Sequence, residues 1–64
     1  MNLDEMQAKA REITDRRVAN AVSVALFLIA EKGRDVRAAA TTGARRSGAP
    51  GRVVEAAVRG ILTD

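Results

Sequence analysis

Residues 36–54 contain four arginines and a serine that could bind a polyanion, and the only acidic residue near this stretch, Glu55, follows it. These residues are Arg37, Arg45, Arg46, Ser47 and Arg52. A guanidinium is charged at any physiological pH, and its planar N–H donors match the oxygens of a phosphate or the edge of a guanine. The residue types and their clustering therefore favour contact with a polyanion.

The charge of the chain is unevenly distributed. Residues 1–31 carry four cations and five anions, whereas residues 32–59 carry seven cations and two anions. The formal net charge is +3, and the excess positive charge lies in the second half of the chain. Arginine outnumbers lysine nine to two, but a G/C-rich coding sequence would produce the same bias. The alternative interpretation of the arginines is therefore a solvated loop.

The composition excludes most catalytic and metal-binding chemistry. The 64 residues include no Cys and no His, so thiolate nucleophiles, disulfides, imidazole acid–base groups and Cys/His metal sites are absent. A chain of this size also has little room for a dry pocket. We expect no enzyme activity, no metal and no cofactor.

The N-terminal sequence predicts a cytoplasmic protein without membrane contact. Asp4 and Glu5 occupy positions where a secretory signal would have Lys or Arg. The longest uncharged stretch, residues 18–30, spans roughly 20 Å as a helix, which is shorter than a bilayer core of about 30 Å. Because it has no cationic face, peripheral membrane attachment is the least favoured alternative.

The sequence pattern predicts an all-α domain of three helices over residues 1–64, and these helices position the arginines. Residues 1–32 contain neither Gly nor Pro, and we expect one long helix there, with Asn2 as its cap. Thr14 and Asp15 leave open two helices with a bend near residue 14. Gly33 is placed to end the helix in the left-handed conformation.

The apolar pattern of residues 18–30 predicts an oligomer, most simply a homodimer. The segment is apolar nearly all round, and 13 of the 30 apolar residues of the chain are alanines that offer little area to cover it. The expected interface residues are Val18, Ala21, Val22, Ala25, Phe27, Leu28 and Ile29. The alternative is a monomer whose later helices cover this segment.

The second half, residues 33–64, is expected to form a basic helical unit. Asp35 can cap a short helix over residues 36–42, which Gly43 would end. Residues 43–51 then read as a loop rich in Gly and Arg. Ser47 is placed to cap the last helix, with Pro50 tolerated in its first turn.

The spacing of small residues in this half resembles that of helix-turn-helix DNA-binding units. Counting Asp35 as the first position puts Ala39 at the fifth and Gly43 at the ninth, where those units have a small residue and a glycine. The resemblance implies that the recognition helix starts near Ser47, with the arginines at its groove-facing end.

A second similarity, also within residues 33–62, is to the C-terminal DNA-binding domain of Lsr2-type nucleoid proteins. Gly33 and Val36, followed by Pro50, Val53 and Val54, are similar to the residues that flank its arginine loop. Both resemblances imply the same partner. The sequence thus predicts a dimeric DNA-binding protein of the regulatory, nucleoid or mobile-element kind. The alternative is a helical module that binds another protein and no nucleic acid.

Overall fold

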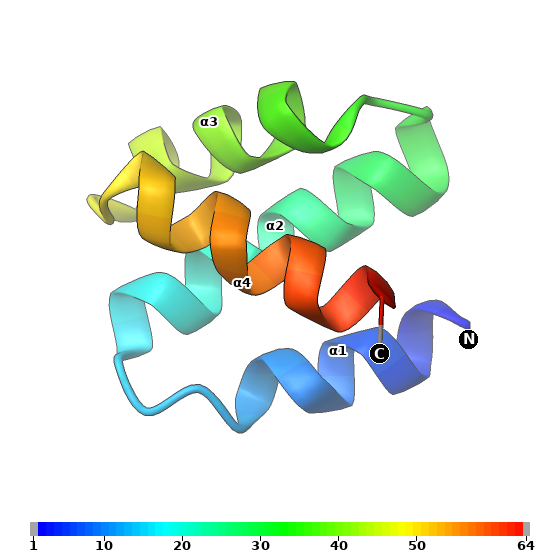
Figure 1. Ribbon diagram of the computed structural model, residues 1–64, viewed down its shortest axis with the longest axis horizontal. Helices are drawn as coiled ribbons and strands as arrows, with labels where there is room; N and C mark the ends of the chain where they lie inside the picture. The colour runs from blue at the N-terminus through cyan, green and yellow to red at the C-terminus, as the bar shows by residue number, and fades with distance from the viewer. Residues whose placement is uncertain (1, 64) are drawn as a thin grey trace.

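The computed structural model describes residues 2–63, which form four helices and no strand. The helices are α1 (Leu3–Arg11), α2 (Arg16–Lys32), α3 (Val36–Ser47) and α4 (Gly51–Thr63). Figure 1 shows α4 in front of α2, with α1 below and α3 above. The prediction of an all-helical fold is confirmed for these residues, although there are four helices in place of three.

The first helix of the prediction is divided in two. Asn2 caps α1 as expected, because its Oδ1 accepts the backbone N–H of Glu5 at 2.8 Å. A new cap then starts α2, where Asp15 Oδ1 accepts the N–H groups of Arg17 at 2.9 Å and Val18 at 3.3 Å. The expectation of one continuous helix was therefore wrong, and the alternative with a bend near residue 14 holds. The break lets α1 fold back onto α2 and α4.

The connection between α2 and α3 follows the predicted capping residues. Gly33 ends α2 with φ of 66°, a left-handed conformation that a residue with a Cβ adopts at a cost. Asp35 caps α3, since its Oδ1 accepts the N–H of Ala38 at 3.0 Å. Only three residues separate these two helices, so α3 returns directly along α2.

The end of α3 corrects the prediction of a loop over residues 43–51. Gly43 does not stop the helix; it lies buried inside it, and α3 continues to Ser47. Gly48, with φ of 68°, ends the helix instead. Pro50 then precedes α4, and its carbonyl accepts the N–H of Val54 at 3.1 Å. Ser47 is consequently the last residue of α3, and it does not cap α4.

One apolar core joins all four helices, and α2 contributes most to it because it packs against the other three. Its buried residues are Val18, Ala21, Val22, Ala25 and Leu26. Four of these were predicted to form an interface with a second copy, and that prediction is wrong because the chain covers them itself. Phe27 is exposed, while Leu28 and Ile29 are partly buried. The apolar pattern of α2 therefore no longer requires a dimer.

Small residues on α3 explain how a chain rich in alanine covers α2. The buried residues of α3 are Ala39, Ala40, Gly43 and Ala44. Because these side chains are short, the backbones of α2 and α3 approach each other closely. Packing of backbone atoms against the neighbouring helix then replaces the contacts that larger side chains would make. Alanine side chains offer little area, but this close approach allows them to cover α2.

Candidate nucleic-acid interface

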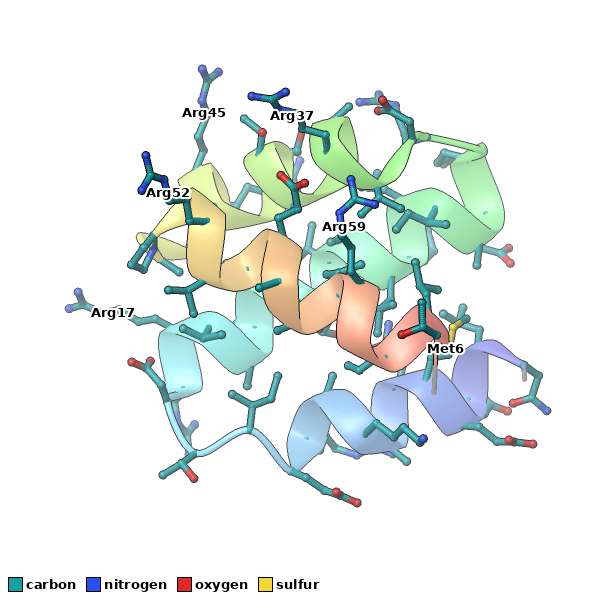
Figure 2. All side chains as sticks on the ribbon, viewed as in Figure 1. Met6, Arg17, Arg37, Arg45, Arg52 and Arg59 are labelled. Carbon is teal, nitrogen blue, oxygen red and sulfur yellow. The ribbon has the colours of Figure 1, made fainter. Side chains whose placement is uncertain are left out.

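Two of the predicted arginines lie on one outward face of α3. Arg37 and Arg45 are eight residues apart, which places them on the same side of a helix about two turns apart. Both are exposed, and Figure 2 shows both side chains pointing away from the bundle. Thr41, between them on this face, donates its hydroxyl to the carbonyl of Arg37 at 2.9 Å. The outward face of α3 is thus cationic at both ends and small in the middle.

Arg52 joins this face from the beginning of the next helix. It occupies the first turn of α4, just after the turn of residues 48–50 that links α3 to α4. Arg52 is exposed, and its side chain projects outward from the N-terminal end of α4 (Figure 2). We call Arg37, Arg45 and Arg52 the α3–α4 basic surface.

The arginines of the α3–α4 basic surface are not neutralised by any residue that the structure describes. Within residues 2–63, none of the three forms an ion pair. Glu55 is the nearest acidic residue along α4, but it pairs with Arg59. The Oε2 atom of Glu55 lies 3.0 Å from Nη2 of Arg59 and accepts a hydrogen bond from Nε of Arg59 at 3.1 Å. Along the helix, Glu55 is three residues from Arg52 and four from Arg59, so either arginine is within reach. The structure selects Arg59 and leaves Arg52 available.

Arg46 and Ser47 do not join the same surface. Arg46 lies on a different side of α3, where it lines a groove together with residues of α1 and α2. Ser47 is partly buried at the end of α3, so it does not stand at the start of a recognition helix as the resemblance implied. The five predicted residues therefore do not form one surface, since these two lie apart from Arg37, Arg45 and Arg52. The arginine loop implied by the Lsr2-type similarity is also replaced by a helical turn at these positions.

The outer face of α4 contains a feature that the sequence analysis missed. Arg52, Glu55, Ala56 and Arg59 line a shallow hollow on this helix. Ala56 is small and exposed beside the two arginines, so a flat or convex polyanion can approach the helix backbone there. The spacing of these residues was visible in the sequence, but its meaning depended on where α4 begins.

Residues 2–63 offer neither a metal site of the common kind nor a helix that could span a membrane. No group of three His, Cys, Asp or Glu side chains is arranged to hold a metal ion. None of the four helices has both the length and the apolar character that crossing a bilayer requires.

No family model, no curated protein and no solved structure matches this chain. What the α3–α4 basic surface can bind must therefore be inferred from its own residues. Exposed guanidiniums without protein partners can donate bidentate hydrogen bonds to phosphate oxygens and can release condensed counterions from a nucleic acid.

Proposed function

We propose that this chain binds double-stranded DNA through the α3–α4 basic surface. The observation that carries the proposal is that Arg37, Arg45 and Arg52 are exposed, unpaired within residues 2–63, and carried by two helices joined through a tight turn. Such a surface offers charge to phosphates from two elements at once, which fixes the orientation of the protein on a duplex.

The connection between α3 and α4 supports a helix-turn-helix interpretation in a shifted register. The turn contains three residues and begins with a left-handed glycine, Gly48, which suits the short turns of that motif. With Gly48 as the ninth position, the fifth position is Ala44, a small and buried residue. The register is thus five residues later than the one proposed from Asp35. In this interpretation α4 is the helix that approaches the bases.

Arg52 and Arg59 have different roles in the proposal. Arg52 stands at the start of α4 and has no partner among residues 2–63, so it can contact a phosphate or a guanine edge without breaking an ion pair there. Arg59 must first leave Glu55, with which it forms an exposed pair. Exposed pairs of this kind contribute about 0–1 kcal/mol, so DNA can displace the carboxylate.

The test is titration of a fluorescent duplex of mixed sequence at two salt concentrations, about 50 and 200 mM. Three phosphate contacts predict an affinity that falls with salt, with a log–log slope of about −2.7. Arg45→Ala and Arg52→Ala are expected to weaken binding by about 1 kcal/mol each, which is about fivefold. Arg11→Ala is the control, because Arg11 is an exposed arginine of α1, a helix that does not contact α3.

Absence of binding at the lower salt concentration would overturn the proposal and favour the protein-interaction alternative. Equal losses from Arg11→Ala and Arg45→Ala would show that only net charge matters and that the α3–α4 basic surface is not the site. Self-association stays a separate prediction. Size-exclusion chromatography with light scattering tests it.

A further inference from the structure

A groove lies over α2 between α1 and α3, and no residue of α4 lines it. It forms because α1 and α3 both pack on α2 while their backbones do not contact each other. Figure 1 shows these two helices on opposite sides of α2. The groove has a volume of about 560 Å³. It is therefore a separate face of the molecule from the α3–α4 basic surface.

The floor of this groove is apolar and carries the only aromatic residue of the chain. Phe27 lines it and is 44% exposed, beside the partly buried Val24 and Leu28. An exposed phenylalanine in a concave site offers a large area that a partner can bury, and aromatic anchors of this kind often dominate binding energy.

The rim of the groove is cationic. Lys32, Arg34 and Arg46 line it, and no Asp or Glu is among the lining residues. None of these three cations forms an ion pair within residues 2–63. The occupant that complements them carries carboxylates around apolar side chains.

The α1 wall of the groove adds an unsatisfied acceptor. Gln7 lines the groove and donates its Nε2 to the carbonyl of Ser23 at 2.9 Å. Its Oε1 is buried and has no hydrogen-bond partner. A buried acceptor without a partner costs free energy.

We propose that this groove binds an acidic amphipathic helix of a partner protein, with apolar side chains on Phe27 and carboxylates on Lys32, Arg34 and Arg46. Laying the apolar face of a helix into a groove between two helices is a recurrent mode of peptide recognition. This inference does not depend on DNA binding, because the two surfaces share none of their residues.

Two other occupants fit the groove less well. A second copy of the chain in a two-fold contact would set the same cationic rim against itself, because such an interface uses the same patch on both subunits. Duplex DNA would satisfy the cations but would leave Phe27 against a charged, hydrated backbone. An acidic apolar helix satisfies both the floor and the rim.

The probe is a labelled peptide of about four helical turns, roughly 15 residues, with leucines at i, i+4 and i+7 and glutamates elsewhere. Binding is measured by fluorescence anisotropy and located by the amide resonances of the ¹⁵N-labelled full chain. Control peptides carry lysine in place of glutamate, or serine in place of leucine. We expect only the glutamate–leucine peptide to bind and to shift the resonances of Ser23, Phe27 and Thr42, which line the groove.

Arg45 and Arg46 provide a matched pair of variants. They are adjacent and exposed in the last turn of α3, but only Arg46 lines the groove. Arg45→Glu and Arg46→Glu carry the same net charge, so a difference between them reports position. Arg46→Glu is expected to weaken the peptide about tenfold and Arg45→Glu to change it little. The effects on duplex DNA are expected to be reversed.

Phe27→Ala tests the floor of the groove, and its thermal unfolding shows whether the fold is retained. With the fold retained, we expect the peptide to bind about tenfold more weakly. Equal binding of the lysine peptide, or shifts confined to other residues, would overturn the proposal. It would also fail if duplex DNA shifts the groove resonances, or if those resonances depend on protein concentration because a second copy occupies the groove. A failure of DNA binding alone leaves these outcomes unchanged.

Discussion

Gly43 of α3 lies against the backbone carbonyl of Ala21 in α2, with no space for a side chain between them. A Cβ built on Gly43 would overlap the oxygen of Ala21 and would lie 3.1 Å from its carbonyl carbon. Since the neighbour is backbone in the middle of a helix, it cannot move aside without shifting α2. This contact sets the distance between the two helices that form most of the core.

Gly43→Ala is therefore expected to destabilise the protein, although alanine has the higher helix propensity. Overpacking against backbone costs about 1–3 kcal/mol, which exceeds the gain in propensity of about 1 kcal/mol. Gly60→Ala is the matched control, because Gly60 is exposed in α4 with open space around its Cβ position. It should be neutral or stabilising by up to about 1 kcal/mol. Urea denaturation followed by circular dichroism measures both, and a stabilising Gly43→Ala would contradict the close approach.

The neighbours Leu26 and Phe27 should respond in opposite ways to truncation. Leu26 is fully buried and Phe27 is 44% exposed. Leu26→Ala is expected to cost about 2–5 kcal/mol, enough to unfold much of a domain this small. Phe27→Ala is expected to cost about 1 kcal/mol, because much of its area faces solvent already. If Phe27→Ala proved the more damaging of the two, α2 would instead bury the side that carries Phe27.

Asp15 separates α1 from α2, and its cap is expected to be needed for that break. Asp15→Ala removes the acceptor for the N–H groups of Arg17 and Val18, which costs about 1 kcal/mol. Asp15→Asn keeps an acceptor and should lie within a few tenths of a kcal/mol of the parent chain. The midpoint of thermal unfolding measures both. Equal losses from the two variants would show that the carboxylate charge, and not the cap, stabilises the start of α2.

Local capping chemistry was predictable from the sequence because it depends on neighbouring residues alone. Asn2, Gly33 and Asp35 were each assigned their observed positions. Asp15 was recognised as a restart signal, but a continuous helix was preferred. A continuous helix through residue 14 would hold residues 3–11 away from the rest of the chain. The break allows them to pack on α2 and α4, and this packing depends on tertiary contacts that the local sequence does not show.

The assignments around residues 43–48 failed for a related reason. Gly43 and Gly48 are both possible helix ends, and the choice depends on the packing of Gly43 against α2. Selecting Gly43 placed Ser47 at the start of the last helix and grouped Arg46 with Arg45. Once α3 is extended to Ser47, successive residues point to different sides of the helix. The basic region of the sequence therefore separates into two surfaces that no linear count of charges distinguishes.

The dependence of DNA affinity on salt should follow the position of the arginines and not their number. Arg45→Ala/Arg52→Ala removes two residues of the α3–α4 basic surface, whereas Arg11→Ala/Arg16→Ala removes two exposed arginines that line a hollow beside residues 12–15. Both double variants have the same net charge, so the long-range attraction of the whole molecule is reduced equally.

Loss of two phosphate contacts is expected to reduce the magnitude of the salt slope by about 2 in the first double variant. The second should retain nearly the parent slope, because its arginines release no counterions from the bound duplex. Anisotropy titrations over a series of salt concentrations measure both slopes. Equal slopes in the two double variants would mean that the duplex is held by net charge without a defined surface, and α4 would then lose its role as the helix that approaches the bases.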